Sequence, residues 1–133
     1  MDFCSAHFGK PLNSLTIDDV KSYFEDERIE TDQIEFKSIH PTGNIDEKFA
    51  GIQRSVCAFL NSNGGFLIIG VTDKGEPQGL SFDFSLSEDK NEKDFFMLEF
   101  DQMLEHFLSF SIKSNVSGQF YQLNEKDIFV VTV

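Results

Sequence analysis

The sequence predicts an α+β fold, with a mixed β-sheet and two main helices packed mainly on one face. Apolar residues recur at helical spacing from about 46 to 61 and again from about 93 to 108. Short runs with strand character lie before, between and after these two segments, at 34–38, 66–71, 119–123 and 128–133. The order strand, helix, strand, helix, strand, strand therefore accounts for most of the chain.

The length of 133 residues suits a single domain spanning 1–133. Within it, 1–27 is expected to form an irregular N-terminal arm followed by a short helix, and 28–133 the main body. Thr16 and Asp19 have the spacing of a capping box and predict that this helix starts at Ile17. The chain stops at Val133 inside an apolar strand, so we expect it to be part of a longer protein.

The pair Gly64-Gly65 separates the first long helix from the strand that follows it. A glycine after a helix adopts the left-handed conformation that ends it, whereas phosphate-binding loops run from a strand into a helix. We therefore interpret the pair as a helix cap, with Phe59 buried against the strand 66–71. No Gly-x-x-x-x-Gly-Lys motif occurs, so no nucleotide cofactor is expected. Beyond the strand, 73–75 predicts a tight turn and 77–80 a short edge strand.

The composition narrows the classes of function. The formal net charge is −12 and the eleven Lys and Arg residues are scattered, which argues against a module that grips phosphates by charge alone. The sixteen Phe residues are interpreted as core, and Cys57 as a buried free thiol. Neither a signal peptide nor an apolar run long enough for a membrane span is present, so a cytoplasmic location without membrane partners is expected.

The tetrapeptide Ile34-Glu35-Phe36-Lys37 carries the candidate chemistry. In a strand Ile34 and Phe36 share one face and Glu35 and Lys37 the other, so we expect one face to be core and the other to be chemistry. Carboxylates are the ligands that Mg²⁺ prefers, and a nearby lysine can stabilise developing negative charge. The alternative is an exposed Glu35–Lys37 ion pair worth little. His7, His40 and His106 form no recognisable ligand pattern, and His106 is expected at the surface.

A longer pattern resembles a known family. It comprises Glu35-Phe36-Lys37, the segment Ala-Phe-x-Asn-x-x-Gly-Gly-x-x-x-x-Gly-Val from Ala58 to Val71, then Asp73, Gly75 and Gly79-Leu80. These residues resemble the Schlafen/AlbA family, whose members are also catalogued as DNA-binding or divergent AAA-type domains. The resemblance extends over about 28–133. Bacterial members are labelled transcriptional regulators, and animal Schlafens with this fold include metal-dependent endoribonucleases that cut structured RNA.

The resemblance implies a site and a function. In those nucleases two glutamates five residues apart and an aspartate just after the Gly-Val strand form the site, which corresponds here to Glu30, Glu35 and Asp73, with Lys37 following. It implies Mg²⁺ or Mn²⁺ as cofactor and RNA or DNA as partner. The nucleases pair two such lobes in a positively charged cradle, whereas this chain has one acidic lobe, so a homodimer is expected. The rival hypothesis is a non-catalytic DNA-binding regulator or protein-interaction module.

Overall fold

The computed structural model describes residues 8–20, 34–38, 45–72, 76–80, 92–123 and 125–133. Its elements are, in order, η1 (Leu12–Ser14), β1 (Ile34–Lys37), α3 (Ile45–Leu60), β2 (Phe66–Ile69), α4 (Glu92–Phe107), α5 (Phe110–Lys113), β3 (Ser117–Leu123) and β4 (Lys126–Thr132). The four strands form one sheet in the order β1-β2-β4-β3. β1 runs parallel to β2, and the other two pairs are antiparallel. The mixed sheet and the α+β class are therefore confirmed.

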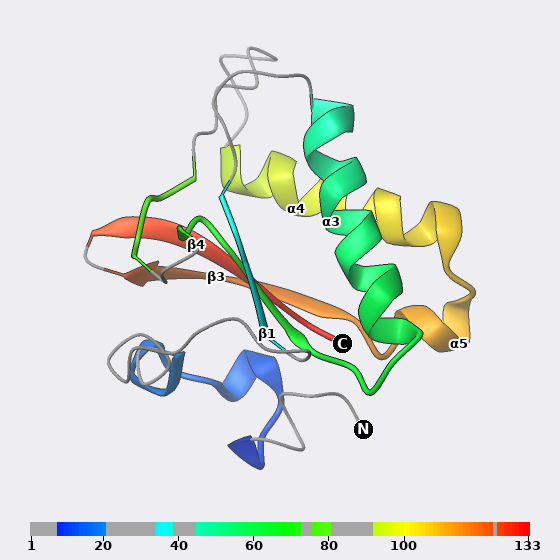
Figure 1. The fold of residues 1–133 in the computed structure, drawn as a ribbon, viewed down its shortest axis with the longest axis horizontal. Helices are drawn as coiled ribbons and strands as arrows, with labels where there is room; N and C mark the ends of the chain where they lie inside the picture. The colour runs from blue at the N-terminus through cyan, green and yellow to red at the C-terminus, as the bar shows by residue number, and fades with distance from the viewer. Residues whose placement is uncertain (1–7, 21–33, 39–44, 73–75, 81–91, 124) are drawn as a thin grey trace.

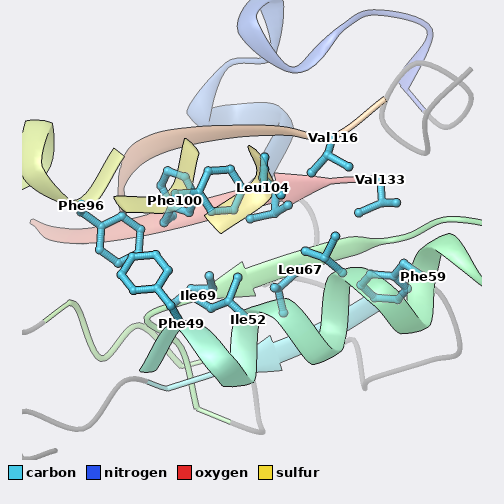
Figure 2. Packing of buried hydrophobic residues seen from close by; sticks show 13 residues of the cluster. Phe49, Ile52, Phe59, Leu67, Ile69, Phe96, Phe100, Leu104, Val116 and Val133 are labelled. Carbon is cyan, nitrogen blue, oxygen red and sulfur yellow. The ribbon is translucent and has the colours of Figure 1, made fainter. Parts of the chain in front are cut away.

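Helices α3 and α4 cover one face of the sheet (Figure 1). Ile52, Val56 and Phe59 of α3 are buried in the same cluster as Leu67 and Ile69 of β2. Figure 2 shows Ile52 and Phe59 of the helix in this cluster, together with Leu67 and Ile69 of the strand. Each fully buried aliphatic or aromatic side chain contributes about 1.5–3 kcal/mol to folding, so this layer supplies much of the stability.

Helix α4 joins this layer through aromatic residues. Phe96 and Phe100 both pack edge-on against Phe129 of β4, with ring centroids 4.9 and 5.1 Å apart. The Phe96 ring also contacts the ring of Phe49 of α3, with the two centroids 5.0 Å apart, and this contact joins the two helices. The prediction that the phenylalanines fill the core is confirmed for these residues.

The buried stripe of α4 differs from the one that the sequence suggested. The spacing of Phe95, Leu98 and other apolar residues predicted the helix, but the fully buried positions are Phe96, Phe100 and Leu104. Leu98 is 47% exposed. Apolar residues occur almost all round this helix, so its sequence does not mark which side faces the sheet.

The opposite face of the sheet is covered by the N-terminal segment (Figure 1). Leu12, Leu15 and Val20 are buried in one cluster with residues of β1, β2 and β4. The Tyr121 hydroxyl of β3 donates to the carbonyl oxygens of Leu12 and Leu15, 3.0 Å from each. The end of the expected irregular arm contains a short 3₁₀ turn, Leu12–Ser14, in which Leu12 is buried. The predicted capping box is present: the backbone N–H of Thr16 donates to the Asp19 carboxylate at 2.9 Å.

The end of α3 agrees with the predicted glycine cap. Gly64 has φ +79°, and its N–H donates to the carbonyl oxygen of Phe59 at 3.0 Å. Gly65 then exchanges two backbone hydrogen bonds with Val133.

Cys57, in the last turns of α3, is a free thiol but only half-buried, which corrects the prediction of a buried thiol. It follows Val56, the residue that faces the sheet, and so points partly away from the core.

The chain after β2 reverses direction, but less regularly than predicted. Among the described residues of this reversal a single β-bridge forms, between Val71 and Pro77, so the expected edge strand at 77–80 is wrong. The carbonyl oxygen of Gly70 instead accepts from the N–H groups of both Gln78 and Gly79, at 2.8 Å each. The predicted turn at 73–75 lies outside the described residues. Among the described helices, none is both long and apolar enough to cross a membrane.

Candidate functional site

Glu35 and Lys37 lie on the helix side of strand β1. In the parallel register Glu35 is paired with Leu67 and Lys37 with Ile69, and these two partners belong to the core cluster under α3. Because side chains at paired positions of neighbouring strands share a face, Glu35 and Lys37 point into the layer that α3 occupies. Both are half-buried. The predicted alternation is therefore present, because Ile34 and Phe36 are buried on the opposite face. The helix layer covers the face that carries Glu35 and Lys37, so the two side chains are half-buried rather than exposed.

Strand β1 has only one neighbour, β2, within the described sheet, so the two side chains lie along a sheet edge. The N–H of Gly70 donates to the carbonyl oxygen of Lys37 at 2.7 Å, which ties the carboxyl ends of the two strands together. Gly70 has φ +102°, a conformation that glycine adopts without penalty. The chain leaves β2 directly beside the end of β1.

The Lys37 side chain crosses α3 at Gly51. A Cβ atom built on Gly51 would lie 2.8 Å from Cε and 3.2 Å from Nζ of Lys37, and 3.8 Å from a guanidinium nitrogen of Arg54. Since both cationic groups lie near one point, they are no more than about 7 Å apart. The sequence analysis missed Gly51 and Arg54. The available signal was a glycine in the middle of an amphipathic helix, where it weakens the helix unless another group needs the space.

Two of the predicted metal ligands, Glu30 and Asp73, lie outside the described residues. Glu35 is thus the only member of the predicted set whose position is known, and the set remains a prediction. Within the part of the chain that the structure describes, no three His, Cys, Asp or Glu side chains gather closely enough to hold a metal ion. Asp73 follows Gly70 by three residues in the chain, and Glu30 precedes Glu35 by five.

In the described part of the chain, the two carboxylates with shifted pKa values belong to surface contacts away from β1. The Lys10 amine, 2.7 Å from the carboxylate, together with hydrogen bonds from Thr16, lowers the pKa of Asp19 from 3.8 to about 2. A hydrogen bond from Lys113 at 2.9 Å lowers the pKa of Glu105. Both pairs fix local structure, at the N-terminal helix and between α4 and α5.

A groove of about 380 Å³ separates α3 from α4. Its walls are Phe49, Ala50, Gln53, Glu99, Gln102, Met103 and His106. His106 is exposed, as the sequence predicted. The groove offers hydrogen-bonding side chains over an apolar floor, but it combines one carboxylate with amides and lacks the cationic pair found beside β1.

The fold and these residues together define an α+β domain with two helices on one side of a mixed sheet and a Glu-x-Lys strand at its edge. Residues 30–133 match the family described as Schlafen, AlbA_2, and this chain belongs to that family. The family relationship suggests a function connected with nucleic acids. No curated protein matches the chain.

Proposed function

We propose that this chain is a nucleic-acid-processing domain that cuts RNA with the help of a divalent cation, as a metal-dependent endoribonuclease. In this proposal Glu30, Glu35 and Asp73 hold Mg²⁺ or Mn²⁺, and Lys37 assists phosphodiester hydrolysis. The observation that supports it best is the placement of Glu35 and Lys37 together on the helix side of an edge strand. An edge is a place that a polymeric substrate can reach while both sheet faces are packed.

The known donor fits a hard cation. Glu35 presents a half-buried carboxylate, and carboxylate oxygens are what Mg²⁺ and Mn²⁺ select. The cation would polarise a phosphate oxygen and favour an attacking water. In this proposal Lys37, which follows Glu35 by two residues on the same strand face, would stabilise the negative charge that grows on the phosphate during hydrolysis. Glu35, besides serving as a ligand of the cation, would orient the attacking water by accepting a hydrogen bond from it.

The charge of the chain sets the conditions for binding. A chain of net charge −12 repels a polyanion at long range, so affinity has to come from the cation and from nearby Lys and Arg side chains. We propose weak binding of RNA or DNA that requires divalent metal. Self-association of two copies would provide a second lobe, so binding should strengthen with protein concentration.

Metal binding tests this proposal directly. Adding Mn²⁺ or Mg²⁺ should raise the melting temperature, because a ligand bound only by the folded state stabilises it by about 2.7 kcal/mol at a hundred times its dissociation constant. Glu35→Gln should remove this response without unfolding the protein. Glu99→Gln is the matched control, because Glu99 is also a half-buried glutamate but lies on α4. Its melting temperature should respond to metal as that of the wild type does. An identical response in wild type and Glu35→Gln would refute the site.

Activity is measured next, on a structured RNA with and without Mn²⁺. Cleavage by the wild type and not by Glu35→Gln supports the endoribonuclease. Tight binding to duplex DNA without metal would instead establish the non-catalytic regulator. If neither cleavage nor binding occurs under any metal condition, the chain is a protein-interaction module.

A further inference from the structure

We propose that Lys37 and Arg54 together bind one phosphate group of a nucleic-acid strand, in a site kept open by Gly51. This inference deepens the proposed function, on which it rests, because the phosphate held here would be presented beside Glu35. Neither Arg54 nor Gly51 belongs to the Glu-x-Lys pattern. What brings the three residues together is the packing of α3 over the edge strand β1.

The separation of the two cations suits a phosphate. The ammonium of Lys37 and the guanidinium of Arg54 both lie close to the space above Gly51, no more than about 7 Å apart. Hydrogen bonds from charged nitrogen to phosphate oxygen are about 2.7–2.9 Å long, so two oxygens of one phosphate group can accept from two cations at such a separation. Arg54 is exposed and Lys37 half-buried, so the site opens to solvent on the Arg54 side.

Gly51 explains how Lys37 reaches this position. The residue is buried, lies inside α3 and is not a helix cap, so its conformation is one that alanine would also adopt. A methyl group there would stand 2.8 Å from Cε of Lys37, closer than real carbon contacts. The glycine therefore gives up helix propensity for space that the lysine stem occupies. The Ser55 hydroxyl donates to the Gly51 carbonyl oxygen at 3.3 Å and supports the same turn.

Electrostatics favour an anion at this point. Two cations held within about 7 Å repel one another, and an anion between them relieves that repulsion. The chain as a whole is strongly acidic, so a local pair of cations lowers the repulsion that a phosphate experiences there. A purely structural role is the competing explanation, in which the lysine stem only covers apolar helix surface.

The first experiment titrates inorganic phosphate in metal-free buffer at constant ionic strength, observed by NMR. The Gly51 amide and the Arg54 Nε–H signal should shift and saturate in the wild type. In Arg54→Gln the apparent dissociation constant should rise at least about fivefold, because one of two charged donors is lost. Lys113→Gln removes one charge from a surface pair on α5 and should bind phosphate like the wild type. Equal phosphate binding by wild type and Arg54→Gln would overturn the inference, as would the absence of saturation.

The second experiment isolates Gly51. Gly51→Ala should weaken phosphate binding about fivefold while leaving the melting temperature equal or higher, since alanine favours the helix and the flexible end of Lys37 can move aside. In a Lys37→Met background, which keeps the stem and removes the charge, Gly51→Ala should cause no further loss. A fall in melting temperature with unchanged phosphate binding would establish the structural role and refute the site.

The tests of the phosphate site and of the proposed nuclease can fail independently of one another. Phosphate binding here needs no divalent metal, whereas the nuclease requires a metal response that depends on Glu35. If the metal response is absent but phosphate still saturates the Lys37–Arg54 pair, the nuclease is wrong and the anion site stands. If metal and cleavage depend on Glu35 but Arg54→Gln binds phosphate normally, the nuclease stands and the anion site is wrong.

Discussion

Phe59 is the residue on which the packing of α3 depends at its C-terminal end. Its side chain is 5% exposed and belongs to the cluster under the helix layer (Figure 2). The Phe59 ring lies directly against Gly65, at the start of the returning chain. Removing a buried phenylalanine ring typically costs about 3–5 kcal/mol, from lost burial and from the cavity left behind. Domains of this size have a total free energy of unfolding of about 5–15 kcal/mol. Phe59→Ala should therefore remove a large fraction of the stability.

Thermal denaturation followed by circular dichroism measures this loss. For a domain of this length about 1 kcal/mol corresponds to roughly 3–5 °C, so the melting temperature should fall by at least about 10 °C. Ala58→Ser alters the preceding, exposed position of the same helix and should melt within about 2 °C of wild type. If Phe59→Ala also melts within about 2 °C of the wild type, the burial of this ring does not hold the helix to the sheet.

A second substitution tests the contact between the Phe59 ring and Gly65. A Cβ atom on Gly65 would collide with the Phe59 ring, so Gly65→Ala should destabilise the wild type. In the Phe59→Ala background the methyl group enters space that the ring has vacated, and its cost should be smaller. The two changes should thus be less than additive by about 1 kcal/mol or more. Strict additivity would mean that the glycine is required for another reason.

Two further predictions concern the N-terminal segment. Tyr121→Phe removes the hydroxyl that donates to the carbonyl oxygens of Leu12 and Leu15, so it should lower the free energy of unfolding by about 1 kcal/mol. Hydrogen exchange at the Leu15 amide should become faster. An unchanged exchange rate would contradict this prediction. The pKa of Asp19 is lowered to about 2 in the folded state, by the Lys10 amine above all, so the stabilisation is complete above about pH 4 and is lost as the pH falls toward 2. Asp19→Asn should flatten the acid dependence of the denaturant midpoint over that range, and equal slopes for variant and wild type would refute the assignment.

The sequence predicted the elements well because each carries strong local signals. The long helix was expected at about 46–61 and spans Ile45–Leu60, since its apolar residues recur with one clear period and glycine ends it. The last two strands were likewise located to within two residues at most ends. The family pattern between Ala58 and Val71 coincides with the end of α3, the cap and β2.

What the sequence could not provide was which surfaces meet. The apolar residues Leu12 and Leu15 gave no periodic signal, yet together with Val20 they are buried against the second face of the sheet. The Tyr121 hydroxyl fixes their backbone there by donating to both carbonyl oxygens. The contact between Lys37 and Gly51 joins residues far apart in the chain and depends on how α3 crosses β1. Alternation along a strand predicts which residues share a face, but not what covers that face.

The covering of both faces changes where chemistry has to be sought. With α3 and α4 on one side and the N-terminal segment on the other, both faces of the described sheet carry a packed layer. The strand edge differs from the covered faces in exposure, because Glu35 and Lys37 are half-buried there and remain partly accessible to solvent. Partial burial excludes enough water to strengthen electrostatic interactions, and the open side admits a polymer. The edge formed by β1 and crossed by α3 is therefore where the proposed phosphate and metal contacts converge.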